Sequence, residues 1–232
     1  MISSNRQHTL AADLQFEGIG LHTGKQAQLR ILPGEANTGY VFVRKDLEGA
    51  PSIEAHVSNV GETLRGTTLQ SGDVSVHTTE HVLAALYASG IDNAVLELDG
   101  PEVPILDGSA LPFMSQIEKV GSTEQEADRR FFKVRKNISY RGEDGVEMLI
   151  VPLEEDEFKV TVMVDYNSPV LGTQHARMEN LGAFKTDIAA CRTFVFLKEV
   201  ASLAEQGLIQ GGDIGNAVVL AERAYSESEL KN

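Results

Sequence analysis

The segment VHTTEHVLAAL, residues 76–86, places two imidazoles and a carboxylate close together: His77, Glu80 and His81. A neutral imidazole is a good zinc ligand, and a carboxylate beside the metal can accept the proton of a hydrolytic water. The three residues also match the H-x-x-E-H pattern of a class of zinc peptidases, in which both histidines lie on one helix. A helix start that binds nothing is the alternative, because the helix dipole alone favours an acid in the first turn.

The predicted elements that carry these residues help to decide whether the two histidines can bind one metal ion. The run DVSVH alternates up to His77, which predicts a strand that ends there. The run TTEHVLAALYASG predicts a helix that is capped by Thr78 or Thr79 and ends at Gly90. His77 on a strand and His81 inside a helix need not converge on one metal ion.

The remaining pattern predicts an α+β chain of two similar units, because strand runs are followed by a helix twice over. The polar stretch GSTEQEADRR, 121–130, is interpreted as a linker between the units. Further strands are predicted at 26–32, 40–44, 52–57, 93–100, 131–140, 145–153, 158–166 and 216–222, and helical segments at 108–121 and 187–207.

Three other segments hold candidate residues. The glycines of GIGLHTG, 18–24, fit a hairpin turn, or a backbone that approaches a ligand closely beside His22. In the loop before the second helix, Asp107 or Ser109 can cap that helix. In CRTFVF, the hydroxyl of Thr193 can satisfy a backbone carbonyl or stabilise a developing oxyanion.

Composition limits the class of protein. The 232 residues carry a formal net charge of −14, which argues against a general binder of nucleic acid or anionic membranes. The single cysteine, Cys191, excludes a disulfide within the chain and favours a reducing compartment. No signal-like or membrane-spanning apolar run occurs, so a cytoplasmic protein without stable membrane insertion is expected.

Five motifs occur in an order and spacing that resemble one enzyme family. They are GIGLHTG, TTEHVLAALYASGIDN, GPEVPILDGSALPF, CRTFVF and GLIQGGDIGNAVV, and they extend from Gly18 to Val219. They resemble the zinc-dependent UDP-3-O-acyl-N-acetylglucosamine deacetylases of lipid A biosynthesis, enzymes of Gram-negative bacteria. The resemblance implies two layered α+β units with the active site between them: residues 1–125 with an insert near 59–70, and residues 126–232 with a βαβ insert near 196–220.

The resemblance also implies roles for individual residues. Glu80 would be the general base, His81 a zinc ligand, and Thr193 the hydroxyl that stabilises the oxyanion, with His77 outside the metal shell. His22 would lie near the catalytic pocket, and Tyr166 would stack on the uracil ring of a UDP-sugar acyl-lipid substrate. The positions expected around the acyl chain are Phe194, Val200, Ile209, Gly212 and Val218.

One part of the family pattern is missing. A catalytic zinc ion needs three protein ligands and an open position, and the family supplies two of the three from a downstream H-K-x-x-D helix that this sequence lacks. We therefore expect the remaining ligands beyond residue 232, a second unit truncated before its last helix, and little or no deacetylase activity from this chain alone. In some bacteria the family is fused to a dehydratase domain.

Two other functions stay open at this stage. The first is a zinc peptidase of the H-x-x-E-H type, which requires His77 as a ligand. The second is a non-catalytic binding protein on the same fold, for which Glu80 would be dispensable. The sequence is silent on the oligomeric state and on the preferred acyl length.

Overall fold

A computed structural model describes residues 5–224 and residue 226. Its main sheet has five strands in the order β2-β3-β8-β4-β5, in which β4 and β8 are parallel and the other neighbours are antiparallel. The strands are β2 Leu14–Ile19, β3 Gln26–Pro33, β8 Ala94–Leu98, β4 Tyr40–Arg44 and β5 Ser52–Glu54. Alternate residues such as Leu29, Ile31 and Phe42 are fully buried, as the alternating sequence predicts.

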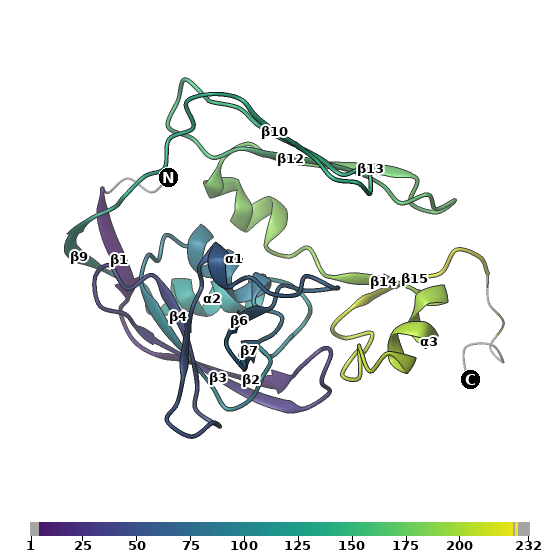
Figure 1. The fold of residues 1–232 in the computed structure, drawn as a ribbon, viewed down its shortest axis with the longest axis horizontal. Coiled ribbons are helices and arrows are strands. Elements are labelled where there is room, and N and C mark those ends of the chain that lie inside the picture. Colours follow the sequence, from purple (N-terminus) through teal and green to yellow (C-terminus); the bar gives the residue numbers. More distant parts are fainter. Residues whose placement is uncertain (1–4, 225, 227–232) are drawn as a thin grey trace.

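Two helices, α1 Glu80–Ala88 and α2 Leu111–Val120, cover one face of this sheet (Figure 1). Their apolar faces complete the core, in which Phe113 of α2 lies against Phe16 of β2 with ring centroids 4.9 Å apart. The short hairpin β6 Leu69–Ser71 and β7 Val74–Val76 leads into α1, and the 3-10 turn Val57–Asn59 precedes that hairpin.

The sequence prediction for α1 is confirmed fully at its end and in part at its start. Gly90 ends the helix with φ 76°, and its N–H donates to the carbonyl of Tyr87 at 3.0 Å, as predicted. At the other end, Thr79 is the N-cap residue, one of the two predicted, but its hydroxyl makes no capping hydrogen bond. The Thr78 hydroxyl donates to Glu102, and the Thr79 hydroxyl donates to the carbonyl of Thr67.

The segment predicted as a linker forms a strand instead. Residues Ser122–Asp128 form β9, which pairs antiparallel with β1 Arg6–Leu10 at the edge of the first unit. Because strand β9 has no apolar face, its sequence carries no alternating signal. The strand extends across residue 125, where the boundary between the units is predicted.

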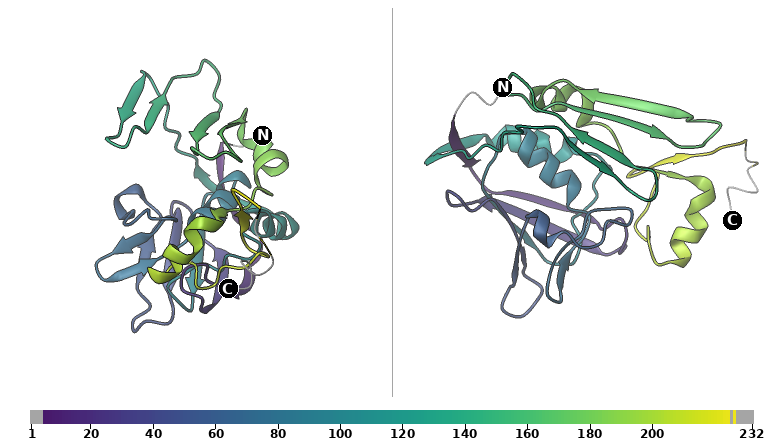
Figure 2. Two further views of the ribbon diagram at one scale, coloured as in Figure 1. Left: turned by 90° about the vertical axis from the view of Figure 1, so that its right-hand side faces the viewer. Right: turned by 45° about the horizontal axis from the view of Figure 1, so that its top comes forward.

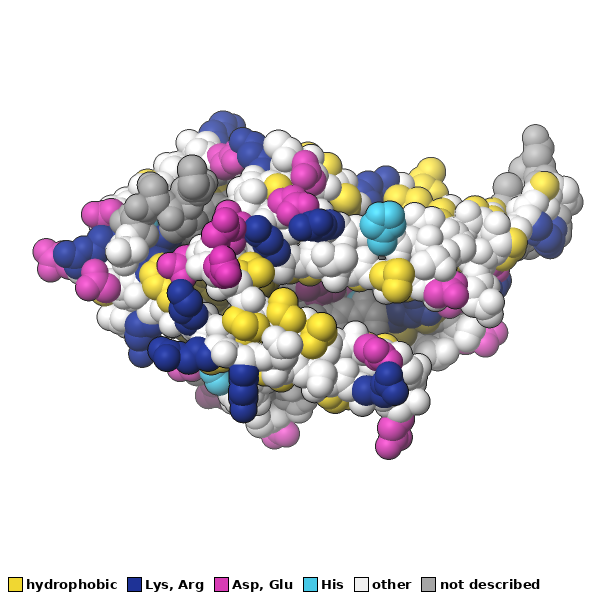
Figure 3. Space-filling model, turned by 90° about the horizontal axis from the view of Figure 1, so that it is seen from above, with side chains coloured by type: hydrophobic (Ala, Val, Ile, Leu, Met, Phe, Trp, Pro, Cys, Tyr) yellow, Lys and Arg dark blue, Asp and Glu magenta, His cyan; other side chains and the backbone are white. Residues whose placement is uncertain are grey.

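Two long hairpins form a separate layer above α1 and α2 (Figures 1 and 2). They are β10 Ile138–Arg141 with β11 Glu147–Ile150, and β12 Val160–Asp165 with β13 Thr173–Met178. Many of their hydrophobic side chains are exposed, among them Met148, Leu149 and Met163. Figure 3 views the molecule from above, where hydrophobic side chains lie between acidic and basic ones.

The segment 187–207, predicted to be largely helical, contains a strand as well as helical residues. A 3-10 turn at Leu181–Ala183 and a π-helical turn at Phe184–Ile188 are followed by strand β14 Phe194–Phe196 and then by helix α3 Leu197–Glu205. Strand β15 Val218–Leu220 pairs parallel with β14, so β14, α3 and β15 form a βαβ unit at one end of the molecule (Figure 1).

The α+β class predicted from the sequence is confirmed, because the structure combines few helices with several sheets. Among the described residues, no helix has both the length and the apolar character that a membrane span requires.

Candidate active site

The start of α1 presents Glu80 and His81. Oε2 of Glu80 accepts a hydrogen bond from the backbone N–H of Thr67 at 2.9 Å, which fixes the carboxylate against the loop before β6. Burial lowers the pKa of the His81 imidazole, and the negative charges of Glu80 and Asp107 oppose this shift only in part. The ring is therefore neutral at pH 7, which is the form that can ligate a metal ion.

The ring of His77 takes part in hydrogen bonds of its own. It follows strand β7, and its Nδ1 lies 3.0 Å from the hydroxyl of Thr68 while its Nε2 lies 3.2 Å from the hydroxyl of Ser75. Both ring nitrogens thus have hydrogen-bond partners within the first unit. This arrangement argues against the peptidase alternative, which needs one of those nitrogens for the metal.

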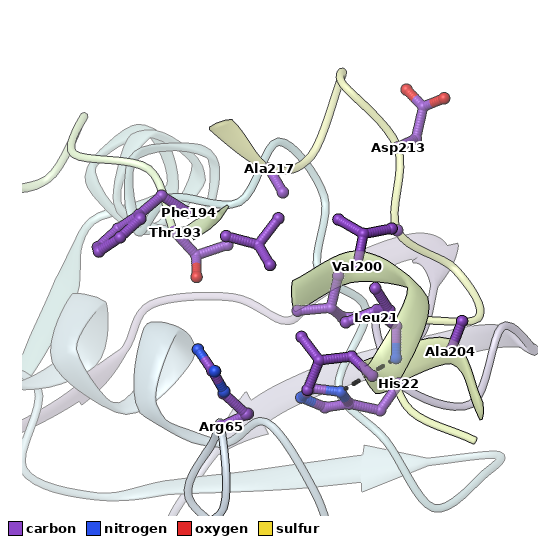
Figure 4. A pocket seen from close by; sticks show the side chains of 13 residues that line it. Leu21, His22, Arg65, Thr193, Phe194, Val200, Ala204, Asp213 and Ala217 are labelled. Carbon is purple, nitrogen blue, oxygen red and sulfur yellow. Dashed lines mark hydrogen bonds between the residues drawn. The ribbon is translucent and has the colours of Figure 1, made fainter. Parts of the chain in front are cut away.

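The loop GIGLHTG brings His22 to the site. The backbone N–H of His22 donates to Oε1 of Glu102 at 2.9 Å. The ring Nδ1 accepts from the N–H of Ile209 at 3.5 Å, the dashed bond in Figure 4. The other ring nitrogen, Nε2, is buried and has no hydrogen-bond partner among the residues that the structure describes. A buried polar atom without a partner costs free energy, which makes this nitrogen a candidate for contact with a ligand.

Gly66 lies beside both His22 and the catalytic candidate Glu80. A Cβ on Gly66 would lie 3.4 Å from Oε1 of Glu80 and 3.6 Å from Nε2 of His22. The carboxylate oxygen and the imidazole nitrogen therefore face the same small space. The absence of a side chain at residue 66 keeps that space open.

A cavity of about 200 Å³ opens beside His22, between the first unit and the βαβ unit (Figure 4). The predicted residues that line it are His22, Thr193, Phe194, Val200, Ile209 and Gly212. Val218 does not line it but pairs in register with Phe194. Most of the lining is apolar, with Leu21, Leu203 and Ala217 adding to it, so the cavity suits a hydrocarbon chain.

Thr193 links the cavity to the first unit. Its N–H donates to the carbonyl of Gly108 at 2.8 Å, and its own carbonyl accepts from the N–H of Val218 at 2.9 Å. Its backbone is thus held on both sides, and its side chain lines the cavity. The ring of Tyr166 lies edge-on to those of Phe194 and Phe196, with centroids 5.4 and 6.2 Å apart.

Three residues that the sequence did not single out also belong here. Arg65 lines the cavity and forms an ion pair of 3.0 Å with Glu199 of α3. Gly66 keeps space open, and Glu102, 1% exposed, is hydrogen-bonded to the His22 loop. An acid between the two prolines of GPEVP is an available signal for a buried carboxylate, but Arg65 and Gly66 carry no pattern of their own.

The fit to a metal ion is partial. Within residues 5–224 and 226, no three or more His, Cys, Asp or Glu side chains gather where they could hold a metal ion. His81 has the chemistry of one ligand, because burial keeps its imidazole neutral. The described residues thus do not form a complete metal centre.

Comparison with known proteins identifies the family. The model of the family described as LpxC, UDP-3-O-acyl N-acetylglycosamine deacetylase, matches residues 7–231. The bifunctional enzyme LpxC/FabZ of Chlorobaculum tepidum is 44% identical over 227 residues, which cover 97% of this chain and 48% of that protein. The deacetylases of a Geobacter species and of Cellvibrio japonicus are 43% and 40% identical, and 72% and 75% of their lengths are covered.

The chain thus spans about half the length of the bifunctional relatives and about three quarters of these deacetylases. Both the family match and the two deacetylases extend over nearly the whole chain. The chain belongs to the UDP-3-O-acyl-N-acetylglucosamine deacetylase family.

Proposed function

We propose that this chain carries half of a zinc-dependent active site that removes the N-acetyl group of UDP-3-O-acyl-N-acetylglucosamine and releases acetate. The observation that supports it best is that a polar space beside Glu80 adjoins an apolar cavity. The carboxylate of Glu80 and the unpartnered Nε2 of His22 face one small space. His22 also lines the neighbouring apolar cavity of about 200 Å³. A substrate that combines an amide with an acyl chain fits this pair of environments.

The roles of the residues are assigned from their match to the motifs of the family, and the chemistry of each residue agrees with its role. Glu80 accepts the proton of the attacking water, as a general base within reach of the reacting amide. Thr193 donates a hydrogen bond from its hydroxyl to the oxyanion that develops on the amide carbonyl. A bound zinc ion would polarise that carbonyl and make the water more acidic. The free amine and acetate are the products.

The substrate is held by the βαβ unit and its neighbours. Phe194, Val200, Ile209, Gly212 and Val218 surround the acyl chain in this proposal, and four of them line the cavity. Tyr166 stacks on the uracil ring. Its contacts with Phe194 and Phe196 support this role, because the three rings form an aromatic cluster beside the cavity.

The metal site needs more than the described residues. We propose that His81 supplies one ligand to zinc and that the other ligands lie outside residues 5–224 and 226. The 232-residue chain alone then has little or no deacetylase activity. We also propose two similar layered α+β units, with inserts near 59–70 and 196–220, and a cytoplasmic location.

Metal analysis tests this proposal. Zinc content after dialysis is measured for the 232-residue chain and for the longest protein that its reading frame encodes. We expect stoichiometric zinc in the longer protein only, and its loss in a His81→Ala variant. His77→Ala serves as the control, because both nitrogens of that ring already have partners. Tight stoichiometric zinc in the short chain, or loss in the control, would contradict the proposal.

A further inference from the structure

Glu102 is a buried carboxylate with four hydrogen-bond donors around it. Its side chain belongs to a residue that is 1% exposed. Oε1 accepts from the N–H of His22 at 2.9 Å and from the hydroxyl of Thr78 at 2.8 Å. Oε2 accepts from the N–H of Thr23 at 2.8 Å and from its hydroxyl at 2.7 Å. A charged acceptor in a dry environment makes such bonds strong.

These bonds join two segments that are far apart in the sequence. His22 and Thr23 belong to the glycine loop, whereas Thr78 lies two residues before Glu80. The backbone around Glu102 adds to the link, because the N–H of Val103 donates to the carbonyl of His77 at 3.2 Å. Glu102 thus fixes the His22 loop and the start of α1 to one another.

The backbone adopts an unfavourable conformation at Thr78, where this link is made. Thr78 has φ 57°, in the left-handed region that a β-branched residue rarely adopts. This turn redirects the chain from β7 into α1, and the bond to Glu102 holds it. At Gly20, any Cβ would overlap Oε2 of Glu102, so the glycine allows the carboxylate its close approach.

We propose that Glu102 is a positioning residue of the active site, which sets the place of the His22 ring relative to the Glu80 carboxylate. This inference rests on the proposed function, because it assumes that the space between those two groups receives the substrate. Glu102 lies behind the His22 loop and acts through its hydrogen bonds, without touching that space.

The charge of the carboxylate agrees with this role. Burial raises the pKa of Glu102, but the hydrogen bonds from His22, Thr23 and Thr78 outweigh it and hold the pKa below the usual value. The group is therefore ionised at pH 7 and accepts all four bonds. An amide in its place would direct its NH₂ group at a backbone N–H, that of His22 or that of Thr23, whichever way it is turned.

The first experiment uses the 232-residue chain and needs no enzymatic activity. Ring ¹⁵N and ¹H signals of the histidines are compared between the wild type, Glu102→Gln and the control Glu17→Gln, whose side chain is exposed on β2. We expect shifts of the His22 ring in Glu102→Gln and none in the control, with His56 and His175 unchanged in both. Thr23→Val, which removes one donor, covers the case in which Glu102→Gln fails to fold. An unmoved His22 ring in the folded variants overturns the proposal.

The second experiment measures deacetylation by the longest protein of the reading frame. Glu102→Gln is expected to lower kcat by about tenfold or more, with KM changed by less than about threefold, because a small displacement of catalytic groups has effects of this size. Glu102→Asp, which keeps the charge, recovers part of kcat. A rise in KM alone, or an unchanged kcat, overturns the proposal. No deacetylation by the wild type would refute the proposed function, and the histidine signals would still decide the role of Glu102.

Discussion

A methyl group added at Gly66 would change the space between Glu80 and His22 without displacing the neighbouring atoms. A Cβ on Gly66 would lie 3.4 Å from Oε1 of Glu80 and 3.6 Å from Nε2 of His22, which are ordinary contact distances. Gly66 is not among the residues with positive φ, so alanine suits its backbone. Gly66→Ala should therefore fold, and should gain about 0.4–1 kcal/mol of stability through the lower entropy of the unfolded chain.

The same methyl group should be harmful to catalysis. It would occupy the space that Glu80 and His22 share, where the reacting amide is placed by our proposal. A displacement of the substrate by about 1 Å is enough for a loss of roughly a hundredfold in kcat/KM. We expect a loss of about tenfold to hundredfold in the longest protein of the reading frame, while urea unfolding of the 232-residue chain shows equal or greater stability.

The matched control is Gly100→Ala, whose Cβ would meet no atom within 4 Å. It should leave kcat/KM within about threefold of the wild type, because the methyl group lies outside the space in question. Full activity of Gly66→Ala, or equal losses in both variants, would refute the view that the gap at residue 66 is the place of reaction.

Three further predictions concern the framework of the site. The ion pair of Arg65 with Glu199, 3.0 Å long and partly exposed, should give about 0.2–1 kcal/mol in a double-mutant cycle of urea unfolding. This coupling should shrink with added salt, and a salt-independent value would argue against the pair. Burial lowers the pKa of His77 and of His81 below 6.5, so both are protonated more readily in the unfolded chain. The free energy of unfolding should then fall as pH drops from about 7.5 to about 5.5, and replacing both by glutamine should flatten this dependence. An equally steep fall in the double variant would contradict the assignment. Gly20→Ala should lower the melting temperature, because its Cβ would overlap a buried carboxylate oxygen, and an unchanged melting temperature would count against that packing.

Much of the first unit could be predicted from local pattern. The strands β3 and β4 and the end of α1 at Gly90 follow alternation and glycine chemistry, which are properties of a few adjacent residues. Strand β9 could not be found this way. Its partner is β1, and its side chains are polar, so only a long-range pairing defines it. The sequence predicts helix at β14 because a run of three residues shows no alternation, and its partner β15 lies beyond α3.

For the candidate site, too, only part could be predicted from the sequence. The candidate residues Glu80, His81 and Thr193 could be named from the motifs that resemble the family, because their residue types alone leave structural roles open. The supporting geometry could not, since it depends on approaches between distant segments. Gly66 matters only because His22 lies beside it, and Glu102 only because the glycine loop folds over it.

One measurement addresses the central claim that Glu80 is the base of a hydrolytic site. Acetate release from UDP-3-O-acyl-N-acetylglucosamine is followed for the longest protein of the reading frame and for its Glu80→Gln variant, both loaded with zinc. We predict hydrolysis by the wild type and a loss of at least about a hundredfold in kcat in the variant, at similar zinc content. Undiminished acetate release by the variant would contradict the assignment of Glu80, whatever the other residues do.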